Sequence, residues 1–464
     1  MRALRLLIVF AVVGGVAPAA AAREARPDAV VAIVDTGINP YHDTFADDSP
    51  RAYRHPSTYI DGYPKDAQAL SLSLDEPSFE KAFVKDCKRV WARVEPGKLY
   101  WVPGTKIAGA ITFGPQGPAG CGSWRAMAGY IFDWYGHGTM TASRAASREY
   151  GACRSCRIVA IQPMHEPATG EEGFTQAVDF AGENASWIDV QSNSWGPVAP
   201  VWDPTNLSGV NLASSELIRA VERAARSHLA FWASGNGAAT RGGVAGHPAF
   251  LQPHMTPSAI TVGAHDSGYV TTWHGFPPHV ISDGCASWAA ETGSTTEARG
   301  DVGSGTSAAT PYAAGGAAEI LLEARRILGD DSTGVDGGVV ARGRRGLVAR
   351  GPLADGKLTL EEWKRLLFVT ATPRPEGQHE DGPACDPVQA SGLWFTTPVK
   401  WSDVPEDFPE YVNTGYGAVD DAALRLAAAV LTGRGEAPDR SEVDAYFEHE
   451  RAIREATHEV YTTP

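Results

Sequence analysis

Near the start of the chain stands Ala29-Val30-Val31-Ala32-Ile33-Val34-Asp35-Thr36-Gly37, an apolar run that ends on a carboxylate and a glycine turn. A continuous run rich in β-branched residues predicts a strand buried on both faces, as in a parallel sheet. Asp35 would then lie at the carboxyl edge of that sheet. Functional groups of open α/β sheets collect at this edge, so the stretch predicts both a fold class and a site.

Further apolar runs and helical patterns alternate along the chain. Strands are predicted at 157–161, 187–191, 228–233 and 259–262, and helices at 138–150, 173–184 and 214–227. This alternation is typical of an α/β fold with a mostly parallel central sheet and helices on both of its faces.

The two ends of the chain differ from its middle. Residues 1–22 carry Arg2 and Arg5, then a short apolar run, then small residues, which predicts a signal peptide and an exported protein. An N-terminal anchor that is never cut is the alternative. We expect one catalytic domain over 23–432 and a charged tail over 433–464, in which a helix at 441–461 docks on the domain.

Two internal segments break the alternation. Residues from about 43 to 132 are rich in Pro, Gly, Tyr and Trp and hold two cysteines. They predict a long insertion between the first strand and the helix that bears His137, with a fold of its own or a disulfide to hold it. Residues 329–356 are rich in Gly and Arg and predict a flexible surface loop.

The net charge of the chain limits the classes of molecule that it is expected to bind. There are 40 basic and 55 acidic residues, a net charge of −15, and no Lys/Arg cluster. This balance argues against nucleic acid and anionic membranes as partners.

The chain has six cysteines, Cys87, Cys121, Cys153, Cys156, Cys285 and Cys385. An even count in an exported chain allows up to three disulfides, without choosing the pairing. Cys153 and Cys156 form a C-x-x-C pair, and no second pair follows at the spacing of a zinc site. A local disulfide or two unrelated thiols is therefore favoured over a redox pair or metal site.

Four short motifs carry the chemistry. In chain order they are Asp-Thr-Gly at 35–37, Gly-His-Gly-Thr at 136–139, Gly-Asn-Gly at 235–237 and Gly-Thr-Ser at 305–307. They supply the groups that activate a serine as a nucleophile and hold the oxyanion it creates. We predict Ser307 as the nucleophile, at the start of an Ala-rich helix whose free N–H groups favour negative charge. His137 is the predicted base, Asp35 orients it, and the Asn236 amide binds the oxyanion.

Each motif has an ordinary interpretation when it is taken alone. A serine at a helix start serves as an N-cap, and Asn-Gly is a common tight turn. Asp-Thr-Gly also occurs in aspartic proteases, but that mechanism needs a second aspartate motif, which this sequence lacks. The four motifs together, in this order, favour nucleophilic catalysis by serine.

With these motifs the chain resembles the subtilisin-like serine proteases (subtilases, peptidase family S8) from about residue 29 to residue 428. Residues 33–38, 136–139 and 305–307 match the cores of the family's three catalytic motifs, and 415–420 resembles its closing motif. Some positions depart from the family pattern. Met140, Thr141 and Ser143 stand where His, Val and Gly are usual, Ala308 and Thr310 replace Met and Ala, and Tyr312 stands where His is common.

The resemblance implies an endopeptidase that cleaves proteins or peptides through an acyl-enzyme. It also implies a substrate cleft with two walls, one from Ser194, Trp195 and Gly196 and the other from Ala233, Ser234 and Gly235. Trp195 stands where Leu is common, so its indole either narrows the pocket or packs outward. The chemistry needs no cofactor, and a structural calcium ion, frequent in the family, has no assignable ligands. We expect a secreted monomer.

The resemblance raises a question about folding and restraint. Family members carry an inhibitory propeptide before the catalytic aspartate, whereas only a short segment separates the predicted cleavage site from Asp35. One hypothesis is that the insertion replaces it as a folding aid or a lid. The rival is a passive surface domain.

Two other functions compete with the peptidase. A subtilase fold can serve as a catalytically weak or inactive binding protein, and the same serine can serve an esterase or acyltransferase. The α/β-hydrolase form of such an enzyme needs Gly two residues after the serine, and Ala309 is there instead.

Overall fold

A computed structural model describes residues 28–114, 121, 131–163, 172–195, 214–234, 256–266, 269–272, 278–284, 287–303, 305–328, 339–342, 352–353, 357–373, 399–400 and 415–462. Its centre is an 11-stranded sheet in the described part of the chain. In spatial order the strands are β15 (Val399–Lys400), β9 (Tyr269–Thr272), β8 (Ile260–Asp266), β7 (Leu229–Ala233), β6 (Val190–Asn193), β1 (Val30–Val34), β5 (Arg157–Gln162), β4 (Ile107–Thr112), β3 (Tyr100–Trp101) and β2 (Gln68–Ala69), with β10 (Val280–Asp283) also paired to β8.

The middle of the sheet is parallel. Every pairing from β4 through β5, β1, β6 and β7 to β8 is parallel, whereas β3–β4, β8–β9 and β9–β15 are antiparallel. After β1 the chain forms β2, β3, β4 and β5 on one side, moving inward until β5 lies next to β1, and then builds outward on the other side through β6, β7 and β8. The carboxyl ends of β1, β6 and β7 therefore meet at one edge, close to this change of direction.

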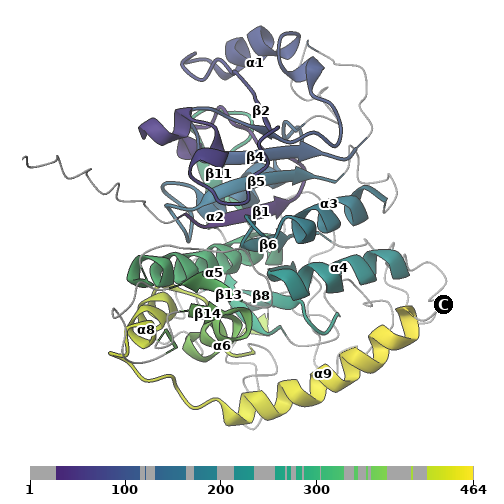
Figure 1. Cartoon of the computed structure of the whole chain (residues 1–464), viewed down its shortest axis with the longest axis vertical. Helices are drawn as coiled ribbons and strands as arrows, with labels where there is room; N and C mark the ends of the chain where they lie inside the picture. Colours follow the sequence, from purple (N-terminus) through teal and green to yellow (C-terminus); the bar gives the residue numbers. More distant parts are fainter. Residues whose placement is uncertain are drawn as a thin grey trace, which may run out of the picture.

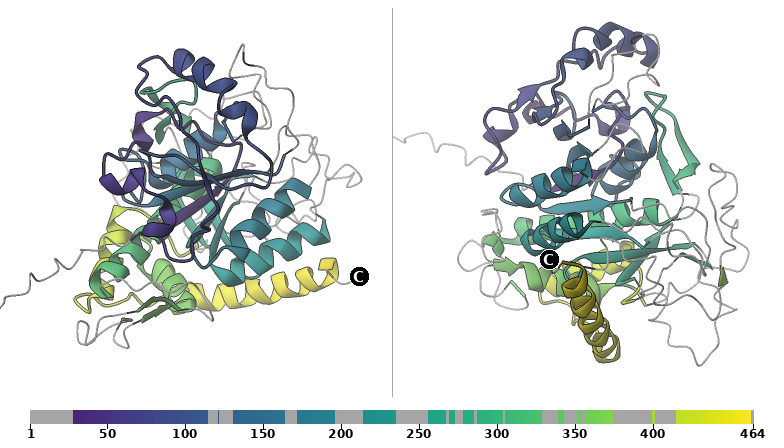
Figure 2. Two further views of the ribbon diagram at one scale, coloured as in Figure 1. Left: turned by 45° about the horizontal axis from the view of Figure 1, so that its top comes forward. Right: turned by 90° about the vertical axis from the view of Figure 1, so that its right-hand side faces the viewer.

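Helices cover both faces of the sheet (Figures 1 and 2). α2 (His137–Ala146) and α5 (Thr306–Leu328) pack on the face to which Val31 and Ile33 of β1 point. α3 (Glu172–Glu183) and α4 (Ser215–Ser227) lie on the other face, where Val30 and Ala32 contact α3. Successive strand residues point to opposite faces, so β1 is apolar throughout because both faces are covered. This arrangement confirms the predicted fold class.

Most of the predicted elements of this layer are present with shifted ends. β6 runs from Val190 to Asn193, later than the predicted 187–191, because Trp187 lies in the turn before it and donates from Nε1 to Asn184 Oδ1 at 2.8 Å. A hairpin of β11 (Ser287–Ala290) and β12 (Ala298–Gly303), which the sequence did not predict, stands beside α2.

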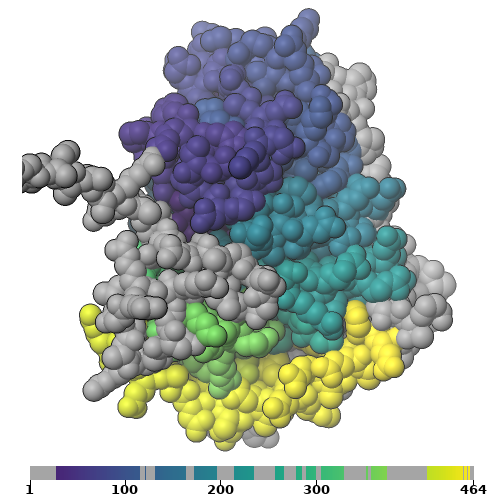
Figure 3. All heavy atoms as spheres, viewed as in Figure 1, coloured from purple at the N-terminus to yellow at the C-terminus, as the bar shows by residue number. Residues whose placement is uncertain are grey.

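The predicted insertion at 43–132 is partly an extension of the central sheet. β2, β3 and β4 lie within it and join the central sheet, where β4 pairs in parallel with β5, so the prediction of an insertion outside the sheet was wrong for residues 68–69, 100–101 and 107–112. The rest of its described part contains α1 (Phe79–Cys87) and short 3-10 helices at Asp43–Phe45, Pro50–Tyr53, Pro56–Thr58 and Trp91–Arg93. Figure 3 shows this purple segment at the opposite end of the molecule from the yellow C-terminal helix.

An aromatic cluster joins α1 to the domain. Tyr41, Phe79, Phe83 and Trp91 all pack near Phe132, with ring centroids 5.2 to 6.4 Å from it. Phe132 lies in an isolated bridge with Ile38, just beyond the end of β1. The described part of the insertion thus packs, through buried aromatic side chains, against the segment that lies next to the predicted site.

Two disulfides are present among the described cysteines. Cys87 at the end of α1 is bonded to Cys121, and Cys153 is bonded to Cys156. The first confirms that the insertion is tied by a disulfide, and the second confirms the local disulfide favoured for the C-x-x-C pair. Cys285 and Cys385 lie outside the described residues.

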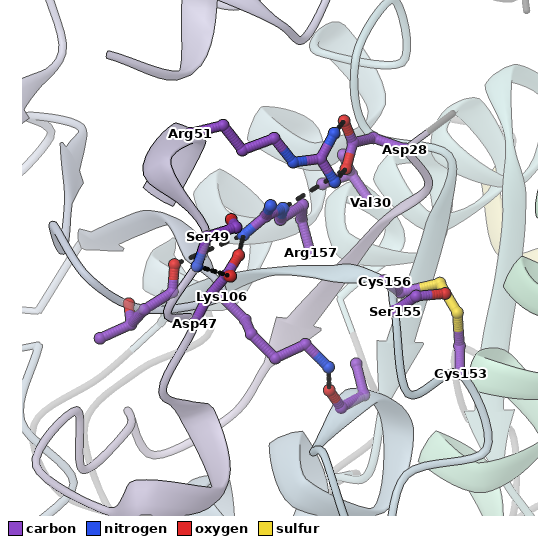
Figure 4. A network of polar contacts seen from close by, with 12 residues as sticks. Asp28, Val30, Asp47, Ser49, Arg51, Lys106, Cys153, Ser155, Cys156 and Arg157 are labelled. Atoms are coloured by element: carbon purple, nitrogen blue, oxygen red, sulfur yellow. Dashed lines mark hydrogen bonds and ion pairs between the residues drawn. A yellow bond between two sulfur atoms is a disulfide. The ribbon is translucent and has the colours of Figure 1, made fainter. Parts of the chain in front are cut away.

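A buried polar network links the insertion to the first and fifth strands (Figure 4). Arg51 binds Asp28 with two hydrogen bonds of 2.6 and 2.7 Å, and Arg157 contacts both Asp28 and Asp47. Lys106 donates to the carbonyl of Ala146, the last residue of α2, and at 2.6 Å to that of Arg154 in the Cys153–Cys156 loop. Burial lowers the pKa of Lys106 to about 7. Its ammonium satisfies the carboxyl end of α2, opposite the end at which His137 stands.

The C-terminal region is more ordered than its sequence predicted. β13 (Val339–Arg342) pairs with β14 (Lys357–Thr359) inside and just after the predicted flexible loop, which is a correction for residues 339–342. α6 (Leu360–Thr370) and α8 (Asp421–Leu431) follow, and both pack near α5.

α9 (Ser441–Thr462) is the predicted docking helix. Its Phe447 stacks on His279, with ring centroids 4.8 Å apart, and on Tyr416. Its Arg454 is 1% exposed, and Asp444 binds Arg365. These contacts confirm docking on the domain. No helix in the described ranges combines the length and the apolar composition needed to cross a bilayer.

Candidate active site

Asp35 follows β1 directly and is buried, as its sequence setting predicted. Its Oδ1 lies 2.7 Å from Nδ1 of His137 and accepts the Thr36 N–H at 2.7 Å. Its Oδ2 accepts the hydroxyl of Thr141 at 3.1 Å. The carboxylate is therefore held on both oxygens, with one of them directed at the imidazole.

His137 is the first residue of α2, and about a quarter of its side chain (26%) is exposed. Gly136 precedes it with φ at 104°, a backbone conformation that L side chains rarely adopt. Gly138 follows it, and a Cβ there would lie 2.1 Å from the Gly37 carbonyl. The glycines let the start of α2 approach the end of β1 backbone to backbone, which brings His137 to Asp35.

A second carboxylate, which the sequence analysis missed, supports this junction. Asp133 is fully buried. Its Oδ1 accepts the Thr36 hydroxyl and the N–H groups of Tyr135 and Gly136 at 2.9, 3.1 and 2.8 Å. Its Oδ2 accepts the Thr139 N–H at 2.7 Å. Asp133 thus caps the first turn of α2 and fixes the loop that leads into His137.

The two carboxylates set the charge state of His137. Burial of the imidazole lowers its pKa, but the charge and hydrogen bond of Asp35 and the charge of Asp133 outweigh this, so the pKa of His137 is raised above its ordinary value. The site favours an imidazolium more than water does. A base in this position holds a proton well once it has taken one.

Ser307 is the second residue of α5, as the Ala-rich stretch predicted. Its Oγ donates to the Ser194 carbonyl at 3.4 Å, and its own carbonyl accepts the Ser194 hydroxyl at 2.9 Å. Pro311 has no N–H to donate four residues back, which leaves the Ser307 carbonyl available for this bond. The helix start is thereby tied to the end of β6.

The two helix starts also contact each other. Met140, one turn after His137, shares an apolar cluster with Ala308, the neighbour of Ser307, and with Ala289 of β11. Asp35, His137 and Ser307 thus come from three elements that converge at one edge of the sheet. Among the described hydrogen bonds, that of Ser307 Oγ runs to Ser194 and not to His137.

The predicted substrate-binding residues are only partly described. Ser194 and Trp195 follow β6. Ala233 is the last residue of β7, and Ser234 follows it. The Trp195 indole packs against Phe174 of α3 at 4.1 Å and Trp232 at 4.9 Å between ring centroids. Asn236, Gly196 and Gly235 lie outside the described residues.

Residues at positions that depart from the family pattern make specific contacts. Met140 packs beside Ala308, Thr141 reaches Asp35, and Ser143 accepts the Ala290 N–H at 3.0 Å. The Tyr312 ring lies 4.6 Å under the guanidinium of Arg144, which also binds Asp283. These substitutions leave Asp35 and His137 in contact.

Replacing Asp133 with asparagine is expected to move the acid limb of the peptidase pH–rate profile to lower pH. The variant loses a negative charge that raises the pKa of His137, so the imidazole stays neutral to lower pH. A shift of about half a unit is expected. The amide also points a donor at the Thr139 N–H, which should lower the free energy of unfolding by about 1–3 kcal/mol.

The measurements are kcat/KM against pH and urea unfolding. Asp283→Asn is the matched control, since this carboxylate contacts Arg144 at the other end of α2. An acid limb that stays in place or moves upward in Asp133→Asn would contradict the assignment.

Comparison with known proteins identifies the family of the chain. The sequence matches the family model described as "Subtilase family" over residues 26–332, well over half of the chain. The chain belongs to the subtilase family.

One curated relative is the subtilisin-like proteinase Mp1 of Magnaporthiopsis poae, 30% identical over 188 residues, which is 40% of this chain and 44% of the relative. The chain thus spans under half the length of that relative.

Two solved structures with likeness to the chain are a cold adapted subtilisin-like serine proteinase and the epidermin leader peptide processing serine protease of Staphylococcus aureus. The first is 18% identical, with TM-score 0.41, over 76% of this chain and 84% of its own. The second is 12% identical, with TM-score 0.44, over 87% of this chain and 75% of its own.

Proposed function

We propose that this subtilase is a secreted serine endopeptidase whose catalytic triad is Asp35, His137 and Ser307. The observation that carries the proposal is the 2.7 Å contact between Asp35 Oδ1 and His137 Nδ1, at the sheet edge where Ser307 lies in the first turn of α5. Membership of the family supports the same residues through their motifs.

The proposed reaction begins with a rotation about the Cα–Cβ bond of Ser307, which redirects Oγ from the Ser194 carbonyl to His137 Nε2. Oγ attacks the scissile carbonyl carbon while Nε2 takes its proton. Asp35 holds the Nδ1 proton and stabilises the imidazolium. The tetrahedral intermediate then collapses, the C–N bond breaks, and His137 passes the proton to the leaving amine.

Water completes the reaction. His137 removes a proton from the water, which attacks the acyl carbon, and Ser307 leaves with its proton restored. We propose the Asn236 amide and the Ser307 N–H as the donors that hold the oxyanion in both steps. The raised pKa of His137 suits it to carry the proton between the steps.

The proposed substrate is an extended segment of a protein. Backbone at Ser194, Trp195 and Gly196 would pair with it on one side, and Ala233, Ser234 and Gly235 would face it on the other. The chemistry uses side chains and water and calls for no cofactor. Residues 1–22 support export, and a monomer is the proposed state.

Labelling with a fluorophosphonate probe tests this function. The full chain should react covalently, and mass spectrometry of the digest should place the adduct on Ser307. The enzyme should also hydrolyse a peptide amide as well as a matched ester. Absence of labelling would leave an inactive binding protein, and turnover of the ester alone would indicate an esterase.

A further inference from the structure

Thr141 makes a hydrogen bond outside its own helix, to the carboxylate of Asp35. It is the fifth residue of α2, one turn after His137, and is fully buried. Its Oγ1 lies 3.1 Å from Asp35 Oδ2 and 3.1 Å from the Gly138 carbonyl oxygen. The second contact is common for a helical threonine, whereas the first joins the helix to the acidic residue of the site.

A hydroxyl has one proton, so it can donate fully to only one of these acceptors. The Gly138 carbonyl lies inside the helix and accepts an N–H from the following turn. The Asp35 carboxylate is charged, and hydrogen bonds to charged acceptors are about twice as strong as those between neutral groups. The Thr141 proton therefore belongs to Asp35 Oδ2.

This hydrogen bond completes the support of the carboxylate. Oδ1 accepts two hydrogen bonds, from His137 Nδ1 and the Thr36 N–H. Because both meet at one oxygen, they would still allow the carboxylate to rotate about that oxygen. Among the described residues, Thr141 supplies the hydrogen bond to Oδ2. It fixes the plane of the carboxylate and draws charge toward the oxygen that faces away from the imidazole.

We propose that Thr141 is a positioning residue for the reaction, which holds Asp35 in line with His137 and draws the carboxylate charge toward Oδ2. The proposal rests on the triad proposed above. It assigns a purpose to a residue that differs from the valine usual at this place in the family, and valine supplies the nearly isosteric test variant.

The sign of the effect follows from the charge. Without the hydroxyl, the carboxylate is less stabilised by other donors and attracts the imidazolium more strongly. The charged groups that act on the imidazole are Asp35, which follows β1, and Asp133, from the loop before α2. Neither is altered in Thr141→Val, so the His137 pKa should rise, and with it the acid limb of the pH–rate profile.

The experiment compares kcat/KM against pH for the wild type, Thr141→Val and Thr141→Ser. Valine should move the acid limb upward by about half a unit to one unit, and serine, which keeps the hydroxyl, should restore it. Proton NMR should show the low-field Asp35–His137 resonance displaced in the valine variant only. Ser143→Ala is the matched control, because it removes a hydroxyl of α2 that contacts Ala290 instead.

An acid limb and a low-field resonance unchanged in an active Thr141→Val enzyme would overturn the proposal, as would an equal shift in Ser143→Ala. If the valine variant does not fold, Thr141→Ala is read in the same way. A wild-type chain that neither labels at Ser307 nor cleaves peptides would instead refute the proposed function.

Discussion

Alanine at position 307 is expected to lower peptidase turnover by about a million-fold, the size of effect measured in subtilisin, another member of this family. The variant keeps the helix start but loses the only oxygen proposed to bond to the substrate carbon. What activity remains comes from binding and from the oxyanion donors, so some acceleration over water should persist. Single-turnover assays on a peptide amide, together with the fluorophosphonate probe, measure this loss.

Thr310→Ala is the matched control for Ser307→Ala. Thr310 is fully buried in the same helix, and its hydroxyl donates to the Thr306 carbonyl within the helix. Its replacement should change the midpoint of thermal unfolding and leave turnover near the wild-type value. Turnover that survives in purified Ser307→Ala within tenfold of the wild type would place the nucleophile elsewhere.

The strand that carries Asp35 could be predicted because its signal is local and strong. Six successive apolar residues precede Asp35, and an uninterrupted apolar run of this length is typical of a strand in a sheet covered on both faces. The starts of α2 and α5 were predictable for a similar reason, since glycines and small residues precede and fill them. The apolar runs and helical patterns therefore predicted a sheet covered on both faces and the edge at which the site is proposed.

β4 was missed because its neighbours obscured it. Its sequence, Ile107 to Thr112, contains Gly109 and Ala110 and follows a segment rich in aromatic residues and turns. The glycine is needed because a Cβ there would lie 2.9 Å from Val159 of β5. A weak strand signal can thus mark close packing against a neighbour, which only the assembled sheet reveals.

Asp133 and Thr141 show why the support of a site is harder to predict than its reactive groups. Asp133 lies four residues before His137, whereas the usual capping signal is a polar residue directly before the helix, where Gly136 stands. The hydrogen bond from the Thr139 N–H to Asp133 therefore has no matching sequence signal. The contact of Thr141 with Asp35 depends on the angle at which α2 meets β1, and no sequence pattern encodes it.

Trp195 is a residue for which the sequence left two alternatives open. Its place after β6 predicted either a pocket wall or outward packing, and the fold brings it among Phe174 and Trp232. Both partners come from segments distant in sequence, so periodicity could not choose. Its role toward substrate stays a prediction.

Asparagine at position 35 is expected to lower kcat/KM by about ten-thousand-fold at neutral pH while leaving the site nearly unchanged in shape. The carboxylate accepts the proton on His137 Nδ1 at 2.7 Å. With the asparagine oxygen at the Oδ2 position, where it still accepts the Thr141 hydroxyl, the NH₂ group takes the Oδ1 position and faces His137 Nδ1, although it then also meets the Thr36 N–H. His137 would then carry its proton on Nε2, which could no longer take one from Ser307.

The pH profile separates this explanation from simple misfolding. Asp35 raises the pKa of His137, so in Asp35→Asn the residual acid limb should move to lower pH, in the same direction as in Asp133→Asn and opposite to Thr141→Val. The matched control is Asp189→Asn, which removes a buried carboxylate that binds Arg325 at the other end of the sheet. That control should unfold more readily yet turn over normally when folded, because its charge lies far along β6 from the reacting atoms. Equal losses of turnover in both variants would mean that Asp35 serves the fold and not the imidazole.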